Sequence, residues 1–304
     1  MEPTEVLDDG YVILEDRGVL AVDGPDRKAF LQGLVSNDVL KVGPERAVHA
    51  ALLTPQGKYL HDFFILERGE TLLLDCEAAR IEDLKRRLRM YRLRSKVAVE
   101  DRSADWMVAA LIGDGAFERL GVAREWGAAR ALADGVAFAD PRLLQLGVRA
   151  VLPHATATDT LTTAGLRPVG RDAYEALRLA EGVPEGSRDL VVEKSILLES
   201  NFDALNGIAW DKGCYIGQEL TARTRYRGLI KKRLLPVRVE GPLPEPGTPV
   251  LLDGREVGEV RSGFGDAALA LLRLEEIAKA AEQGMPLTAG GATLVPRRPD
   301  WLTP

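Results

Sequence analysis

Residues 212–219 read Lys-Gly-Cys-Tyr-Ile-Gly-Gln-Glu, and no other stretch carries as much information about the fold and function of the chain. Cys214, one of two cysteines, lies between Gly213 and Gly217, and Lys212 precedes it by two residues. Glycine allows the backbone to adopt a positive φ or to lie close against a ligand. A nearby cation favours the thiolate form of a cysteine, so Lys212 predicts a reactive Cys214. A small buried cysteine in a turn is the alternative, and the spacing alone leaves both open.

Further motifs accompany this octapeptide along most of the chain. Ala222-Arg223 and Arg227-Gly228 follow it, and weaker matches lie at residues 30–34, 36–38, 53–62 and 174–178. Together they resemble the signature of the YgfZ family of folate-binding proteins, relatives of the T-protein (aminomethyltransferase) of the glycine cleavage system. The resemblance implies an α+β fold. It places two interleaved, aminomethyltransferase-like folate-binding subdomains in residues 1–233 and a small C-terminal β-barrel in residues 234–304.

The resemblance also implies a function. Proteins of this family bind tetrahydrofolate or a derivative and act in the assembly or repair of iron–sulfur cluster proteins, including tRNA-modifying enzymes. The implied partners are a folate, iron–sulfur assembly factors and client iron–sulfur enzymes. The alternative is a folate-dependent aminomethyl or one-carbon transferase, so whether the chain is an enzyme stays open. A thiol-redox protein working through Cys214 is a third interpretation, although the chain has no Cys-X-X-Cys motif.

Length and composition are those of an ordinary globular protein. The 304 residues are enough for about two domains, and 46% of them are hydrophobic and 28% charged. The formal net charge is −6. Non-specific affinity for nucleic acid comes mainly from lysine and arginine at the phosphates, so we expect no direct binding to nucleic acid.

The cysteines and histidines do not form a metal site in the sequence. Cys76 and Cys214 make no disulfide framework, which fits a reducing compartment, and they are too few for an iron–sulfur cluster, which usually takes four thiolates. His49, His61 and His154 lack the spacing of metal ligands. The acidic N-terminal segment resembles no targeting peptide, and no apolar run approaches the length of a membrane span. We therefore expect a cytoplasmic protein without a metal site or membrane contact.

Hydrophobic patterns predict the remaining architecture. Two apolar runs, 48–53 and 60–66, flank a turn and predict a β-hairpin. Amphipathic helices are expected over residues 77–92 and 171–181, and the first has a basic outer face. A solvated face is the simpler interpretation of these charges, and a partner surface is the alternative. Short strands at close spacing predict the C-terminal barrel, at residues 234–239, 248–252, 257–261 and 268–272.

The predicted hairpin carries the first candidate site. The matching segment of the aminomethyltransferases has two glycines followed by two adjacent aspartates, and here these positions are Gly57-Lys58 and His61-Asp62. The resemblance implies that Asp62 lies at the folate amine, where a carboxylate can hold or shuttle a proton during one-carbon transfer. His61 can titrate near neutral pH beside it. A surface hairpin with incidental polar residues is the alternative.

The helix at residues 171–181 carries the second candidate site. In the T-protein pattern Leu-Arg-Leu-Glu-Ala-Gly, the glutamate pairs with the pterin ring. Here residues 177–182 read Leu-Arg-Leu-Ala-Glu-Gly, so the acid is displaced by one residue, or about 100° around a helix. Arg178 and Glu181 are therefore candidate pterin contacts, with a salt bridge at the helix end as the alternative.

A series of arginines after the octapeptide forms the third candidate site. Arg223, Arg225 and Arg227 alternate, which would place them on one face of an extended strand. Arginine binds carboxylates in a bidentate manner, and folates end in a glutamate tail. A charged edge strand that resists aggregation is the alternative. The complete candidate set is Cys214, Lys212 and Asp62 for catalysis, and Glu181, Arg178, Arg223, Arg227, Gln218 and Tyr215 for folate binding.

Overall fold

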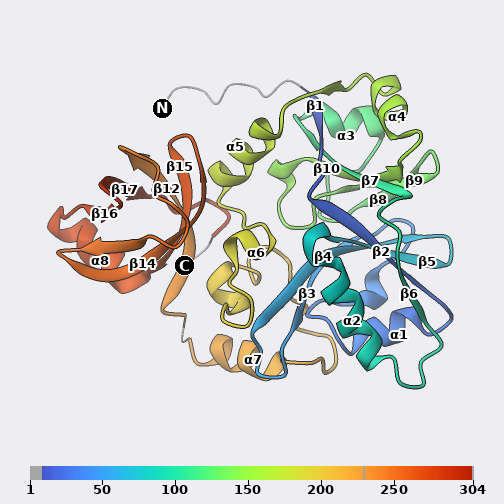
Figure 1. Cartoon of the computed structure of the whole chain (residues 1–304), viewed down its shortest axis with the longest axis horizontal. Helices are drawn as coiled ribbons and strands as arrows, with labels where there is room; N and C mark the ends of the chain where they lie inside the picture. Colours follow the sequence, from blue (N-terminus) through green and yellow to red (C-terminus); the bar gives the residue numbers. More distant parts are fainter. Residues whose placement is uncertain (1–8, 229, 303–304) are drawn as a thin grey trace. The chain divides into compact units, whose positions relative to one another are not determined.

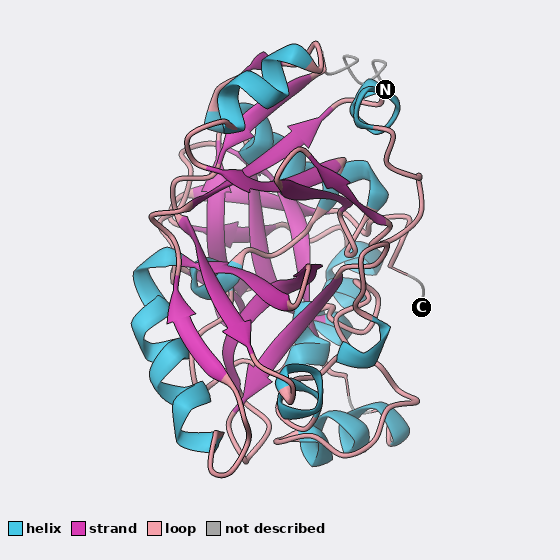
Figure 2. Ribbon diagram, turned by 90° about the vertical axis from the view of Figure 1, so that its right-hand side faces the viewer, coloured by secondary structure: helices cyan, strands magenta, loops and turns pink. Residues whose placement is uncertain are grey.

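Two structural units, each assembled from segments far apart in the sequence, make up the structure. The computed structural model describes residues 9–228 and 230–302. The first unit contains residues 9–52, 61–174 and 205–216, and the second contains residues 53–60, 175–204 and 217–302. Strands and helices occur in both units, so the chain is an α+β protein (Figures 1 and 2).

A five-stranded sheet in the first unit contains most of the predicted hairpin. Its strand order is β3-β4-β5-β2-β6. The strands span Arg17–Asp23 (β2), Val48–Leu53 (β3), Tyr59–Arg68 (β4), Thr71–Glu77 (β5) and Ala98–Asp101 (β6). β3 and β4 are buried along almost their whole length, which explains why both read as continuous apolar runs.

Short helical elements accompany this sheet in the sequence. They are α1 (Arg27–Gln32), the 3-10 turns η1 (Val39–Lys41) and η2 (Ala78–Arg80), and α2 (Ile81–Tyr91). The predicted helix over residues 77–92 therefore begins four residues later than expected, because η2 takes up its start. Ile81, Leu84 and Leu88 form the buried face of α2, with the spacing of one side of a helix.

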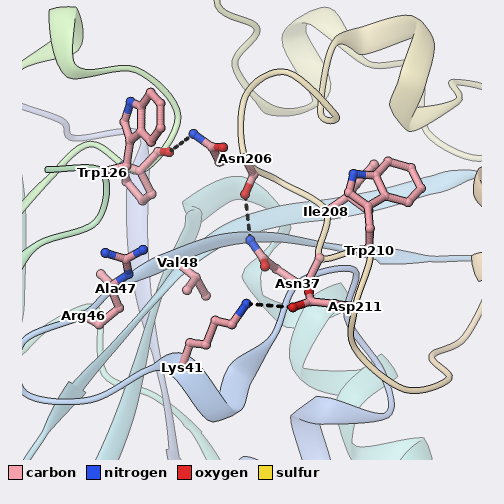
Figure 3. A pocket seen from close by; sticks show the side chains of 12 residues that line it. Asn37, Lys41, Arg46, Ala47, Val48, Trp126, Asn206, Ile208, Trp210 and Asp211 are labelled. Carbon is pink, nitrogen blue, oxygen red and sulfur yellow. Dashed lines mark hydrogen bonds and ion pairs between the residues drawn. The ribbon is translucent and has the colours of Figure 1, made fainter.

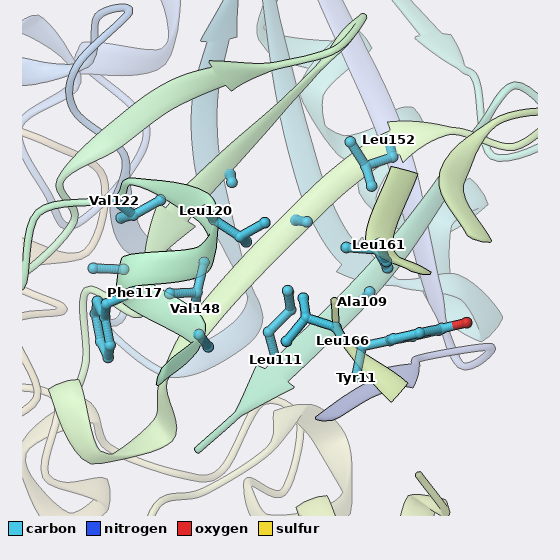
Figure 4. Close-up of a cluster of buried hydrophobic side chains, with 14 of the residues drawn as sticks. Tyr11, Ala109, Leu111, Phe117, Leu120, Val122, Val148, Leu152, Leu161 and Leu166 are labelled. Carbon is cyan, nitrogen blue, oxygen red and sulfur yellow. The ribbon is translucent and has the colours of Figure 1, made fainter. Parts of the chain in front are cut away.

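A six-stranded sheet also lies in the first unit, in the order β11-β1-β7-β10-β9-β8. Its elements are β1 (Gly10–Ile13), β7 (Trp106–Ile112), α3 (Gly115–Leu120), β8 (Ala129–Leu132), β9 (Gly135–Ala139), η3 (Leu144–Leu146), β10 (Val148–Pro153), α4 (Ala157–Thr163) and β11 (Arg167–Pro168). Phe117 of α3 and Leu161 of α4 pack with Leu111 and Val148 of the sheet in one buried cluster (Figure 4). Burying each such side chain contributes about 1.5–3 kcal/mol.

The second unit contains the predicted C-terminal barrel. The barrel is closed, in the order β12-β15-β14-β13-β16-β17, and appears in orange and red in Figure 1. Its elements are β12 (Lys232–Glu240), β13 (Pro249–Leu252), β14 (Arg255–Phe264), β15 (Ala267–Arg273), α8 (Leu274–Gln283), β16 (Leu287–Ala289) and β17 (Ala292–Pro296). Closure pairs the strand edges, which an open sheet of the same strands would leave exposed.

Helical segments precede the barrel, and one of them corrects a prediction. They are α5 (Arg171–Glu181), α6 (Gly186–Asp189), η4 (Leu197–Ser200) and α7 (Gln218–Tyr226). The arginine series lies on α7 and its C-terminal end, so the extended strand expected there is wrong. Glu219 in the first turn and Arg223 and Arg225 in the last turn complement the helix dipole and favour the helix. On a helix, Arg223 and Arg227 share one side, and Arg225 points elsewhere.

Candidate functional site

A pocket of about 400 Å³ opens in the first unit (Figure 3). Trp126 and Trp210 line it, and these two residues are 54% and 36% exposed. The remaining lining residues are Asn37, Lys41, Arg46, Ala47, Val48, Pro141, Asn206, Ile208, Ala209 and Asp211. A volume of this size lies within the range of small-molecule sites.

Hydrogen bonds between distant segments build the pocket wall. The side-chain Nδ2 of Asn37 donates to the backbone oxygens of His49 and Asn206, each at 2.7 Å. The Ser36 hydroxyl donates to the backbone oxygen of Gly207 at 2.6 Å, across 171 positions in the sequence. The loop that begins at residue 205 is therefore fixed against residues 36–37, which is a structural reason for the Ser36-Asn37 motif.

The pocket side chains fit a flat heteroaromatic ligand that carries a carboxylate. Indole rings stack on other aromatic rings. Asn206 donates its Nδ2 to the Pro141 oxygen at 3.1 Å, while its Oδ1 has no hydrogen-bond partner within residues 9–228 and 230–302 and can accept from a ligand. Arg46 is exposed and forms no ion pair in that same part of the chain. The Nζ of Lys41 lies 3.5 Å from Oδ2 of Asp211. A folate combines a pterin, an aromatic linker and carboxylates, so these residues fit it.

Lys212 anchors the loop at the start of the octapeptide, residues 212–217. Its Nζ donates to the backbone oxygens of Gln32, Val35 and Asn37 at 2.9, 2.7 and 2.6 Å. These three bonds use every donor of an ammonium group. Burial lowers the pKa of Lys212 to about 8, against the raising effect of Asp38. The geometry therefore makes Lys212 a group that positions the loop.

Cys214 is exposed, while the residues around it are fixed. The Nζ of Lys212 lies 5.1 Å from the centroid of the Tyr215 ring. This cation–π contact joins two residues that lie on either side of Cys214 in the sequence. Cys76, by contrast, is buried on β5, and burial raises the pKa of its thiol to about 12. The accessible thiol is therefore Cys214, and the alternative of a small buried cysteine at this position is wrong.

The end of the octapeptide is constrained by the backbone. Ile216 donates its N–H to the Gly33 oxygen at 3.2 Å. Gly217 has φ +80°, and a Cβ at this position would lie 2.4 Å from the Thr54 oxygen, so only glycine fits. Gly213 has open space around it and carries no such constraint.

Asp62 is buried on β4, where it pairs with a histidine. Its Oδ2 lies 3.0 Å from Nε2 of the buried His49. Burial lowers the pKa of His49, although Asp62 raises it, so burial favours the neutral ring. Asp62 does not line the pocket. Its part in proton transfer stays a prediction.

His61 does not act together with Asp62. Successive residues of a strand point to opposite faces, and His61 Nε2 lies 2.9 Å from Asp83 Oδ2. Burial, reinforced by the positive charge of Arg80, lowers the pKa of His61 to about 4. The expectation that His61 titrates near neutral pH is wrong, because the charged ring would lose its hydration here.

Arg178 lies in a buried ion network of the second unit. Its Nη1 donates to Asp189 Oδ2 at 2.8 Å and to the Val183 oxygen at 2.9 Å. Its Nη2 donates to Ser262 Oγ at 2.8 Å and to Glu175. These bonds connect α5 with α6 and with β14 of the barrel. The salt-bridge alternative thus describes the observed contacts, and a contact with folate stays a prediction.

The other predicted folate contacts of the second unit are distributed over two helices. Glu181 ends α5; its backbone oxygen accepts a bond from Trp301 Nε1 at 2.9 Å, and burial raises the pKa of its carboxyl. Gln218 begins α7, with Arg223 in its last turn and Arg227 directly after it, and both arginines are exposed. Gln218 and Arg227 therefore lie at opposite ends of α7, and only Arg223 and Arg227 lie close to each other along it.

Sequence reasoning missed the residues that shape the pocket. Trp126 and Trp210 stand in polar stretches without helical or strand periodicity, next to Gly127 and Asp211. A large aromatic residue in such a stretch is not part of a hydrophobic pattern that would place it in the core. This position was the signal from which a binding role could have been predicted. Asn206 gave none, because an asparagine in a loop is ordinary turn chemistry.

Neither a metal centre nor a membrane helix is found within residues 9–228 and 230–302. No three or more His, Cys, Asp or Glu side chains there are grouped so that they could hold a metal ion. No helix of that part of the chain is long and apolar enough to cross a membrane.

Comparison with known proteins confirms the predicted fold class. A family model described as "CAF17, C-terminal beta-barrel domain" matches residues 231–304. The structure is similar to the glycine cleavage system aminomethyltransferase T from Bartonella henselae, with a TM-score of 0.73. The match covers 97% of this chain and 86% of that chain at 16% identity, which shows likeness of fold alone.

Curated relatives resemble the sequence more closely. The chain is 38% identical over 286 residues to the iron-sulfur cluster assembly factor IBA57 of Homo sapiens, and 35% identical over 292 residues to that of Mus musculus. Each match covers 87% of this chain and 77% of the relative. A homologue in Pyricularia oryzae is 32% identical over 312 residues, covering 92% of this chain and 76% of that protein.

All three relatives are named as mitochondrial, which contradicts the cytoplasmic location expected from the sequence. That expectation relied on the lack of a recognisable targeting pattern, which is not evidence of location. Identity above 30% over more than two thirds of the relatives is enough to assign the family. The chain belongs to the IBA57 family of iron–sulfur cluster assembly factors.

Proposed function

We propose that this chain acts in the assembly of iron–sulfur clusters and binds a folate as part of that role. The observation that carries the proposal is its identity of 35–38% to relatives named as iron–sulfur cluster assembly factors, over 87% of its length. The family resemblance in the sequence supports a finer proposal, that the client proteins include tRNA-modifying iron–sulfur enzymes.

The folate belongs in the pocket of the first unit. Trp126 and Trp210 would stack on its rings, and Arg46 would pair with a carboxylate of the glutamate tail. Bound tetrahydrofolate would supply amines that carry a one-carbon unit. The contacts predicted at Glu181, Arg178, Arg223, Arg227, Gln218 and Tyr215 stand beside this set as a second proposal.

Cys214 is the group that meets the cluster. An exposed thiol can ligate iron as a thiolate, and the fixed positions of Lys212 and Tyr215 hold it in one place. A cluster usually takes four thiolates, so a single cysteine must share it with a partner protein. The cluster is therefore cargo, and Cys214 is a contact during its transfer.

Complementation tests the assembly role. Cells that lack the matching assembly factor are supplied with the wild-type chain, Cys214→Ser or Cys76→Ala, and the activity of a client iron–sulfur enzyme is measured. Wild type and Cys76→Ala restore activity, whereas Cys214→Ser does not. Full restoration by Cys214→Ser would contradict the role of the thiol, and failure of the wild type would contradict the function.

Calorimetry with 5-formyltetrahydrofolate tests the folate pocket. One aromatic stack contributes about 0.5–1.5 kcal/mol, so Trp126→Ala weakens binding by a factor of about 2–13, and Trp126→Phe recovers most of it. Arg223→Ala tests the second set in the same way, through loss of a charge-assisted contact of about 1.5–3 kcal/mol. If Arg223→Ala weakens binding and Trp126→Ala does not, the folate binds at the second set of contacts and not in the pocket.

We do not extend the proposal to aminomethyl transfer. The T-protein pattern has two adjacent aspartates, and here only Asp62 is present, buried and bonded to His49. His61, in the other position, is neutral at pH 7.

A further inference from the structure

The end of α2 and the turn after it form a cationic surface on an acidic chain. Residues 89–96 read Arg-Met-Tyr-Arg-Leu-Arg-Ser-Lys, with four cations and no acid, and are called the basic turn here. All four cations are exposed, and none forms an ion pair within the described part of the chain. The cations earlier on α2 differ, since Lys85 pairs with Glu82 and Arg87 with Asp83. The basic turn therefore has charge that the chain itself does not neutralise.

Two apolar side chains lie among these charges. Met90 is 60% exposed, and Leu93 is 89% exposed. Leu93 also has φ +41°, in the left-handed region that a leucine seldom occupies. Such strain persists only where the surrounding structure imposes it, and it gathers at functional sites.

The backbone of the basic turn is held in this conformation. Ser95 donates its N–H to the Arg92 oxygen at 2.8 Å, and Lys96 donates its N–H to Asp26 Oδ2 at 2.7 Å. Leu93 is thus presented to solvent from a turn with defined hydrogen bonds. An exposed apolar residue in a rim of cations resembles the anatomy of a protein interface.

The basic turn and Lys212, two residues before Cys214, contact opposite ends of one short helix in the first unit. Asp26, which binds the turn, directly precedes α1, and Gln32, which ends α1, accepts a bond from Lys212. The six residues of α1 span about 9 Å at 1.5 Å per residue. A protein that docks on the basic turn can therefore reach Cys214 as well.

We propose that the basic turn docks an acidic surface of the iron–sulfur protein whose cluster meets Cys214. The inference deepens the proposed function and rests on it. Charge complementarity selects an acidic partner and speeds its association, with an effect that salt weakens. Four cations on a chain of net charge −6 are few for nucleic acid, and two apolar side chains are few for a lipid surface.

Photocrosslinking in cells tests the proposal with the full-length chain. Leu93→p-benzoylphenylalanine is introduced, and captured proteins are identified by mass spectrometry. Leu243→p-benzoylphenylalanine, at an exposed leucine of the second unit, is the control position. We expect capture of an acidic iron–sulfur protein from position 93 only. Crosslinks to nucleic acid or lipid, or to no iron–sulfur protein, would overturn the proposal.

Charge reversal supplies the second measurement. Arg92→Glu with Arg94→Glu should lower the crosslinking yield at least tenfold, whereas Arg255→Glu with Lys279→Glu makes the same charge change on the barrel and should leave it unchanged. Equal yields for the two pairs would refute the docking site. Complementation by the Arg92/Arg94 pair together with failure of Cys214→Ser would refute docking alone, and failure of the wild type would refute the proposed function.

Discussion

Replacing Arg178 with methionine distinguishes a residue that holds the fold from one that holds a ligand. Methionine keeps an unbranched side chain in the buried site but removes every hydrogen-bond donor of the guanidinium. The carboxylates of Asp189 and Glu175 then lose their shared cation at a site without solvent. We therefore expect a loss of stability whether or not a folate is present.

The remaining partners set the size of this loss. Breaking a buried ion pair costs about 3–5 kcal/mol. Asp189 keeps a bond from Ser262 Oγ at 2.6 Å, and Glu175 keeps Arg188 at 2.9 Å, so we expect the lower half of that range, about 3–4 kcal/mol. At roughly 2–4 °C per kcal/mol, the melting temperature falls by about 6–16 °C.

Urea unfolding followed by circular dichroism measures the effect, with Arg188→Met as the matched control. Arg188 shares Glu175 with Arg178 but is 44% exposed, and ion pairs of such residues contribute about 0–1 kcal/mol. Arg178→Met should therefore be far less stable than Arg188→Met. If Arg178→Met unfolds within 1 kcal/mol of the wild type while folate binding is lost, the network assigned here is wrong and Arg178 is a ligand contact.

Three further predictions concern single groups. His61 has a pKa of about 4 in the folded chain against an ordinary 6.5, so its neutral ring adds about 3 kcal/mol to the free energy of unfolding, and this is lost as pH drops through this window. In urea midpoints, His61→Gln removes this part of the slope and leaves the part due to His49, whose pKa burial also lowers. Lys212→Met removes three hydrogen bonds and speeds hydrogen exchange at the Ile216 amide; unchanged exchange would contradict its anchoring role. Iodoacetamide modifies Cys214 at least about 100-fold faster than Cys76, and a fast phase that survives in Cys214→Ser would show the assignment to be wrong.

The fold was largely predictable because its main signals are local. The β3–β4 hairpin and the barrel strands show as apolar runs separated by turn residues, and the signature motifs supplied the family. The strand predicted for the segment of α7 was wrong because alternating arginines suit one face of a strand. The apolar residues of this segment are too few to show the 3.6-residue period of a helix. The packing around Gly217 and the helix dipole favour the helix over the strand in this segment.

The candidate site was less predictable because backbone groups form much of it. The spacing around Cys214 left a reactive and a buried cysteine both open, and the thiol is exposed. Lys212, however, binds three carbonyl oxygens more than 170 positions away, and a carbonyl leaves no mark in a sequence. Asp62 was placed on the correct strand, but its pairing with His49 depends on the register of two strands and not on spacing along one.

The pocket and the thiol belong to one hydrogen-bonded segment, which brings two separate predictions together. Asn37 lines the pocket, its side chain binds the Asn206 oxygen, and its own backbone oxygen accepts a bond from Lys212. The loop from Asn206 to Cys214 is therefore held at both ends: Asn37 binds Asn206 at the pocket wall, and Lys212 is hydrogen-bonded next to Cys214. Folate binding and cluster contact, inferred from different motifs, thus have a common support. A ligand that shifts the wall at Asn206 acts on the same bonds that position Cys214.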